Sequence, residues 1–327
     1  MTQALFDARP ALDCRPEPRF PALTIGSAAP GGVSLLLHQA ACAFRAQARL
    51  RLRAEPLETA VEGIDATVRG QLLHDALARV WGTLRSSSTL AALDTMAIED
   101  VVERAVADAM DRLAAPLDAV AVRLFELEAQ WLRARLLDVL ALDRTRPSFT
   151  VIAREEPWQL ELGGLRLDLR IDRVDEFNTG AHAIIDYKTS REVVLRHWAG
   201  ERPEAPQLPA YVLAFGPQRV AAVAFGAVRA GNTRYIGLTR DPTAFPELAV
   251  PGATRGSVAE FTDWESMLET WRERLDALVR EFREGEATLA REPATACLYC
   301  HLHALCRIDA AERNPDEAPP AGLLDDH

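Results

Sequence analysis

The spacing of hydrophobic positions predicts that the first part of the chain is helical. Residues 93–143 consist almost entirely of helix formers, and their apolar side chains recur every three or four positions, which indicates two or three packed helices. The stretches 34–52 and 69–84 show the same helical spacing, and Ser34 is suited to be the N-cap of the first stretch. We therefore expect a set of helices ahead of any strand.

The pattern then changes to short runs that are typical of strands. Three runs, 149–162, 164–177 and 182–190, are separated by a turn at Gly163-Gly164 and by the turn residues 178–181, so they predict consecutive strands. Four more elements are predicted downstream: a helix over 205–215, strands over 219–229 and 234–239, and an amphipathic helix over 264–284 that ends at Gly285.

Composition adds limits to this picture. The chain has 327 residues, of which 48% are hydrophobic and 26% charged, as is ordinary for a globular protein. A net charge of −11 argues against a generally basic surface that coats nucleic acid. No stretch approaches the roughly 18 to 20 apolar residues of a membrane span, and no signal peptide begins the chain, so we expect a cytoplasmic protein.

Acidic residues and one lysine mark the second and third predicted strands. Lys188 is the only lysine among 37 basic residues. Because strand side chains alternate between two faces, Asp168 and Asp172 share one face of their strand, and Asp186 lies beside Lys188 on the next strand. Two adjacent strands can thus present Asp172, Asp186 and Lys188 to one point.

This set of residues suits the metal-assisted hydrolysis of a phosphodiester. Carboxylates supply oxygen ligands for a magnesium or manganese ion, and an ammonium group can orient or deprotonate water or neutralise charge on the phosphate. Arginine performs these tasks poorly because its bulkier guanidinium does not give up a proton. The alternative from the strand pattern alone is that Asp186 and Lys188 form an exposed ion pair at a strand end.

Four short motifs resemble one nuclease family in their order and spacing. They are "GQLLH" at 70–74, "IDRVDEF" at 171–177, "DYKT" at 186–189 and "QLPAY" at 207–211. Together they resemble the PD-(D/E)xK nuclease superfamily, in the branch that contains AddB-type and RecB-type recombination nucleases. The resemblance implies an α/β, restriction-endonuclease-like core over 31–310, with a mixed central sheet flanked by helices and a helical insertion at about 90–145. Residues 1–30 and 311–327 are expected to be tails.

The resemblance also implies roles for individual residues. His74, Asp172 and Asp186 would hold Mg²⁺ or Mn²⁺ together with the backbone carbonyl of Tyr187, and Lys188 would serve the attacking water.

The same resemblance extends to the predicted DNA contacts. Gln207 and Tyr211 would steady the catalytic lysine and the DNA strand, and Arg69 would contact phosphate, with a solvated helix face as the alternative for Arg69. For Glu155 and Glu156 we expect a solvated strand end, although both could approach the site.

Cysteine usage points to an accessory site. Five cysteines are present, and three of them lie within 297–306, which suits a metal or cluster site in a reducing compartment better than disulfides. In the family that the chain resembles, one cysteine before the domain and three after it bind a 4Fe-4S cluster that joins the chain ends. The corresponding residues here are Cys42, Cys297, Cys300 and Cys306.

A local zinc site is the alternative for the cysteines. It would use Cys297, Cys300, Cys306 and either His301 or His303, and Cys42 would then be an ordinary small side chain. Cys14 is expected to be a free thiol without a role.

The resemblance implies a deoxyribonuclease, expected to be an exonuclease, that acts in DNA repair or recombination. The rival hypothesis is a nuclease-like fold that binds DNA or another subunit with little turnover. A Walker A loop needs a lysine after its glycines, and the lone lysine lies in "DYKTS" instead. Any ATP-driven unwinding of duplex ends would therefore come from another chain, for which the resemblance implies an AddA-type helicase, or from a missing upstream segment.

Overall fold

The computed structural model describes most of the chain. The described residues are 19–56, 64–113, 119–189, 193–253, 258–290, 293–298 and 300–308. Cys14, the predicted tail 311–327 and most of the predicted tail 1–30 lie outside this part. Every helix in the described ranges is too short or too polar to cross a lipid bilayer.

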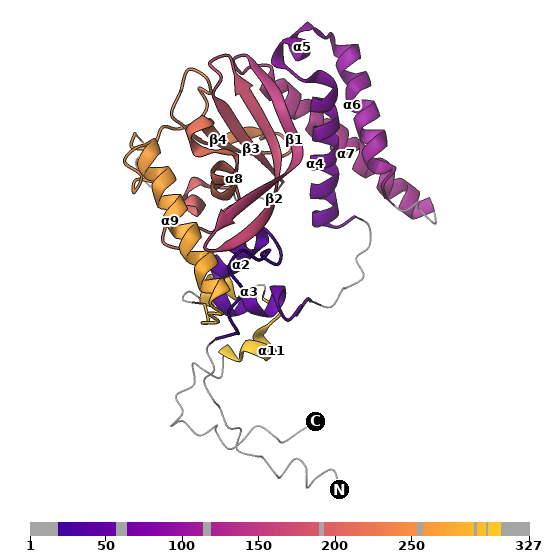
Figure 1. Cartoon of the computed structure of the whole chain (residues 1–327). Helices are drawn as coiled ribbons and strands as arrows, with labels where there is room; N and C mark the ends of the chain where they lie inside the picture. Colours follow the sequence, from indigo (N-terminus) through magenta and orange to yellow (C-terminus); the bar gives the residue numbers. More distant parts are fainter. Residues whose placement is uncertain are drawn as a thin grey trace.

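A mixed five-stranded sheet forms the centre of the molecule (Figure 1). Its strands are β1 (Phe149–Leu162), β2 (Leu165–Phe177), β3 (His182–Lys188), β4 (Val220–Ala227) and β5 (Arg234–Thr239). They lie side by side in chain order; β3 and β4 are parallel, whereas the other neighbours are antiparallel. The predicted meander, the two later strands and the restriction-endonuclease-like fold class are confirmed.

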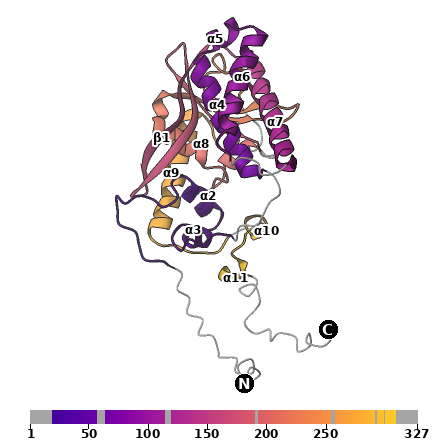
Figure 2. The same ribbon diagram turned by 90° about the vertical axis from the view of Figure 1, so that its right-hand side faces the viewer.

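Helices cover both faces of this sheet (Figures 1 and 2). One face is covered by α4 (Ala66–Leu84), α5 (Ser87–Ala92), α6 (Thr95–Met110) and α7 (Ala119–Asp143). The other face is covered by α2 (Ser34–Ala41), α8 (Gln207–Phe215) and α9 (Trp264–Arg283). Each face has its own apolar core, because buried side chains of successive strand residues point in opposite directions.

The remaining described elements are short. They are α3 (Ala43–Leu50), the 3₁₀ turns η1 (Leu195–Trp198) and η2 (Pro217–Arg219), and the helices α10 (Pro293–Ala296) and α11 (His303–Cys306).

Aspartate caps set the beginnings of the long helices. The carboxylate of Asp65 accepts hydrogen bonds from the backbone N–H groups of Thr67 and Val68 at the start of α4. Asp263 forms a capping box with Ser266 at the start of α9. These bonds satisfy N–H groups that have no partner within the helix, so they fix the residue at which each helix begins.

The prediction of one continuous helix over 34–52 is wrong. The backbone of Cys42 is extended, with φ −165° and ψ 118°, and it separates α2 from α3. Ser34 is not the N-cap either: it is the first helical residue, and its hydroxyl donates to the carbonyl of Gly31 at 2.7 Å. The break lets both short helices face α9, because Gln39 donates to Glu281 at 3.0 Å and Gln47 to the Phe282 carbonyl at 3.0 Å.

The two ends of the described chain meet at the end of α9. The N–H of Phe20 donates to the carbonyl of Gly285 at 2.6 Å, and Arg45 donates to the carbonyl of Ala296 at 3.2 Å. Figure 2 shows α3, α10 and α11 at this same end of the molecule. Cys42 and the three cysteines within 297–306 are therefore carried by neighbouring segments.

Replacing Gly285 with alanine is expected to loosen this junction. Gly285 has φ +80°, and an added Cβ would lie 1.8 Å from the backbone carbonyl oxygen of Phe20, so the junction would have to move. At Gly231, which has φ +69°, an added Cβ meets nothing within 4 Å, so Gly231→Ala carries only the backbone cost of about 1–2 kcal/mol. Thermal unfolding should show a Tm at least roughly 3 °C lower for Gly285→Ala than for Gly231→Ala. Equal Tm values would contradict this packing.

Candidate active site

The backbone of Tyr187, in strand β3, forms hydrogen bonds with two other elements. Its N–H donates to Oδ2 of Asp172 on β2 at 2.8 Å, and its carbonyl accepts from Nε2 of His74 on α4 at 2.9 Å. The helix, the second strand and the third strand are therefore joined at the backbone of one residue. The predicted ligands His74, Asp172 and the Tyr187 carbonyl lie together.

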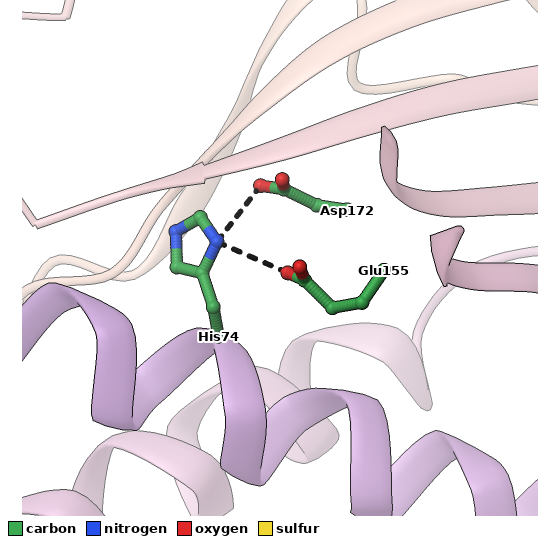
Figure 3. Close-up of side chains that lie close together, drawn as sticks. All are labelled: His74, Glu155 and Asp172. Atoms are coloured by element: carbon green, nitrogen blue, oxygen red, sulfur yellow. Dashed lines mark ion pairs between the residues drawn. The ribbon is translucent and has the colours of Figure 1, made fainter. Parts of the chain in front are cut away.

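A third acidic group completes this arrangement. Nδ1 of His74 lies 3.3 Å from Oε1 of Glu155 and 3.3 Å from Oδ2 of Asp172, as Figure 3 shows. One ligand atom from each of His74, Glu155 and Asp172 lies within 4.8 Å of the other two, which is close enough to share a metal ion. Carboxylate oxygens and an imidazole nitrogen are suitable ligands for a divalent cation.

The position of Glu155 differs from the solvated strand end expected for it. Its side chain is only 22% exposed, and its backbone adopts φ +49°, which directs it toward His74 where β1 would otherwise alternate regularly. Glu156 is exposed. A signal was present in the sequence: counting equal numbers of residues back from the Gly163-Gly164 turn places Glu155 opposite Asp172. The observed pairs on either side, Arg154 with Arg173 and Glu156 with Ile171, have this register.

Neighbouring charges shift the pKa values of the imidazole and of one carboxylate in this site. Burial opposes the protonation of His74, but the carboxylates of Asp172, Glu155 and Asp186 outweigh it and raise the pKa of His74 well above its ordinary value. Burial and the neighbouring Asp172 carboxylate raise the pKa of Asp186 to about 6, against the opposing effect of Lys188. The site thus concentrates negative charge that attracts a cation.

Lys188 contacts Asp186 and a residue of helix α8. Its Nζ is 2.7 Å from Oδ2 of Asp186 and donates to Oε1 of Gln207, on α8, at 2.8 Å. Burial opposes the charge on Lys188, but Asp186 offsets it and raises the pKa of Lys188 above its ordinary value. The side chain is therefore an ammonium group at neutral pH. This state favours orienting water or neutralising phosphate over abstracting a proton.

An open cleft of about 710 Å³ exposes these groups to solvent. His74, Glu155 and Lys188 line it together with the first turns of α4. Two arginines also line the cleft: Arg112 lies 3.0 Å from Asp75, and Arg170 lies 3.7 Å from Glu155. A ligand entering the cleft therefore meets carboxylates and cations side by side.

The two remaining predicted DNA contacts differ in their surroundings. Tyr211 follows Gln207 by one turn of α8, and its pKa is raised by burial and by the nearby Asp186. Arg69 donates to both carboxylate oxygens of Glu128, at 2.6 and 2.7 Å, and is not among the residues that line the cleft. Its contact with phosphate stays a prediction.

The predicted cluster cysteines lie in segments that pack together at the end of α9. Cys42, Cys297, Cys300 and Cys306 are half-buried and form no disulfide within the described ranges. Burial raises the pKa of the Cys297 thiol, and so do Cys300, Cys42 and Cys306 through their negative charge. No three of these thiols lie within 4.8 Å of one another in the described part of the chain.

Replacing Glu155 with glutamine is expected to weaken metal binding. The substitution keeps the shape of the side chain but removes a negative charge beside His74, so the affinity for Mn²⁺ should fall by about tenfold. The matched control is Glu156→Gln on the next residue, which should bind Mn²⁺ as the wild type does. Titration calorimetry measures both variants, and equal affinities would show that Glu155 is no part of a metal site.

Comparison with known proteins agrees with the geometry of the site. A search of curated proteins found no significant match. A family model described as the PD-(D/E)XK nuclease superfamily matches residues 33–307, which is well over half of the chain and includes every predicted ligand. The chain belongs to the PD-(D/E)XK nuclease superfamily.

Proposed function

We propose that this protein is a metal-dependent deoxyribonuclease whose reaction takes place in the cleft beside β3. Proteins of the superfamily are generally nucleases, hydrolases that use divalent metal ions. The observation that carries the proposal is the ammonium of Lys188, held between Asp186 and Gln207 and next to the group of His74, Glu155 and Asp172. Carboxylates that attract a cation and a fixed ammonium that faces the cleft are the groups that phosphodiester hydrolysis requires.

The donor set fits a magnesium or manganese ion. His74, Asp172, Asp186 and the carbonyl of Tyr187 would hold it, with Glu155 as a further carboxylate. Oxygens of Asp172 and Glu155 lie 3.3 Å from Nδ1 of His74, and the Tyr187 carbonyl lies 2.9 Å from its Nε2, so the oxygen donors are gathered around one ring. When bound, the ion would polarise the phosphate and lower the pKa of a water molecule.

Lys188 and Gln207 serve the attacking water and the phosphate. The ammonium orients the water and neutralises charge that develops on the phosphate, and Gln207 holds the ammonium in place. Water forms a bond to phosphorus and gives up a proton, the ester P–O bond breaks, and the leaving oxygen takes up a proton, so that the two proton transfers balance. Tyr211, one turn along α8, supports this side of the cleft.

Arginines are proposed to hold the DNA strand. Arg112 and Arg170 line the cleft, so their charges lie near the phosphates that flank the reacting one. Arg69 would add a contact outside the cleft.

The proposed setting is DNA repair or recombination, with exonuclease action on DNA ends, as the resemblance to AddB-type nucleases implies. The net charge of −11 gives weak attraction to DNA by itself, and the sole lysine lies in the active site instead of in an ATP-binding loop. Both features support a partner that delivers the strand, and an AddA-type helicase fits that task.

Loss of the lysine is expected to abolish cleavage. Wild type and Lys188→Ala, both purified without oxygen, are incubated with end-labelled single-stranded and double-stranded DNA and Mn²⁺ or Mg²⁺. The wild type should cleave and the variant should be at least about 100-fold slower, because the compensating charge is lost. Both should bind DNA, and chelation of the metal should stop the wild type.

Two outcomes would contradict this assignment. Equal cleavage by both proteins would place the reaction elsewhere or in a contaminant. DNA binding without cleavage by the wild type would identify a binding module that has lost its activity.

We further propose that Cys42, Cys297, Cys300 and Cys306 bind a 4Fe-4S cluster that joins the two chain ends. The effect of Cys300, Cys42 and Cys306 on the pKa of Cys297 supports their proximity. A tetrahedral zinc site needs sulfur atoms about 3.8 Å apart, since Zn–S bonds are about 2.3 Å. No three of these thiols lie within 4.8 Å of one another in the described residues, so they do not form such a site as they stand. Nε2 of His301 and Nε2 of His303 each contact a backbone carbonyl oxygen, a contact that a metal-bound imidazole also makes with its second nitrogen, so iron and sulfide analysis separates the cluster from a zinc site.

Cys42→Ser is expected to lose the cluster, whereas Cys14→Ser should retain it. Analysis of protein purified without oxygen should find about four iron and four sulfide per chain in the wild type and in Cys14→Ser. Cys42→Ser should also unfold at a lower temperature, because the cluster closes a long loop. Zinc without sulfide in the wild type, or an intact cluster in Cys42→Ser, would contradict the proposal.

A further inference from the structure

Four charged side chains are buried between the sheet and helix α7. They are Asp143, Arg146, Arg173 and Asp175, here called the buried ion cluster, and each is at most 1% exposed. Arg146 lies 2.8 Å from Asp143 and 2.9 Å from Asp175. Arg173 lies 2.8 Å from Asp143 and 2.6 Å from Asp175. Two positive and two negative charges thus compensate each other away from solvent.

Aromatic rings enclose the guanidinium groups. Arg146 lies over Phe149 at 4.3 Å and over Phe245 at 4.0 Å, and Arg173 lies over Trp81 at 4.1 Å. Removing such groups from water costs several kcal/mol per ion, and apolar residues of similar size often stabilise a fold as well or better. Stability alone therefore does not account for the buried ion cluster. Its fixed geometry points to a role in placing its neighbours.

Two tyrosine hydroxyls bind to the buried ion cluster. The hydroxyl of Tyr187 accepts a hydrogen bond from Nη1 of Arg173 at 2.9 Å. The hydroxyl of Tyr235, on β5, donates to Oδ1 of Asp143 at 2.8 Å. Each hydroxyl binds one member of the buried ion cluster, Tyr187 an arginine and Tyr235 an aspartate, but only Tyr187 belongs to the strand that carries Asp186 and Lys188.

Tyr187 connects the buried ion cluster to the candidate metal ligands. Its side chain reaches Arg173, whereas its own peptide groups bind Asp172 and His74. Its ring lies over Gly226 of β4, where an added Cβ would come within 2.6 Å of the ring. Arg173 also directly follows Asp172 in the chain, so the cluster holds both strands next to the ligands.

We propose that the buried ion cluster is a positioning device for the active site and that the hydroxyl of Tyr187 is its point of attachment to the catalytic strand. The hydroxyl fixes the strand so that the Tyr187 N–H orients Asp172 and the Tyr187 carbonyl faces the proposed metal site. Tyr187 is thus a positioning residue through its side chain. This inference rests on the proposed nuclease function.

The test compares Tyr187→Phe with Tyr235→Phe. Each variant removes one buried hydroxyl from the same cluster, so both should lose a similar part of their stability in urea unfolding. Only Tyr187→Phe should weaken Mn²⁺ binding, by about tenfold, and lower kcat for DNA cleavage by at least about fivefold at saturating Mn²⁺. The KM for DNA should be unchanged in both, because neither hydroxyl lies in the cleft.

Several results would overturn the inference. Wild-type Mn²⁺ affinity and kcat in Tyr187→Phe would show that the hydroxyl positions nothing. Equal losses in both variants would show a general effect of destabilisation. If the wild type binds Mn²⁺ but cleaves no DNA, the nuclease proposal fails, while the Mn²⁺ affinities of the two variants still decide the inference. A wild type that binds no Mn²⁺ overturns both.

Discussion

The structure depends on the need to pair the buried backbone N–H and carbonyl of one residue, Tyr187. An unpaired buried N–H or carbonyl costs about as much as a lost hydrogen bond, and here both groups pair with side chains. Asp172 satisfies its N–H and His74 its carbonyl. These two bonds bring β2 and α4 against β3, and they place a carboxylate and an imidazole at the same point.

The different positions of the lysine and of the buried arginines follow from the shapes of their side chains. Arg146 and Arg173 are flat groups between aromatic rings, and each reaches two carboxylates, which suits a planar fork with several donors. Lys188 reaches Asp186 and Gln207 with a single nitrogen atom at the edge of the cleft. A compact ammonium fits that position and leaves space for substrate. The one lysine in the chain therefore occupies a place where arginine fits poorly.

Local sequence patterns predicted the elements of the fold well, because hydrophobic residues recur with a different period in helices and in strands. The turn at Gly163-Gly164 and the juxtaposition of Asp186 and Lys188 followed from such patterns. The break at Cys42 did not, because the helix pattern continues through it, whereas the contacts of Gln39 and Gln47 with the end of α9 are tertiary. Asp143 and Arg146 resembled ordinary polar residues at a helix end, and their partners on β2 are supplied by the tertiary structure alone. Glu155 required the register and an unusual φ to be recognised.

The most direct test of the central claim is the anomalous diffraction of manganese in crystals of the wild-type protein. We expect a manganese peak bounded by the imidazole of His74, the carboxylate of Asp172 and the carbonyl of Tyr187, with Lys188 in contact with Asp186 beside it. A peak away from these three groups, or crystals that take up manganese with this point empty, would contradict the assignment of the active site.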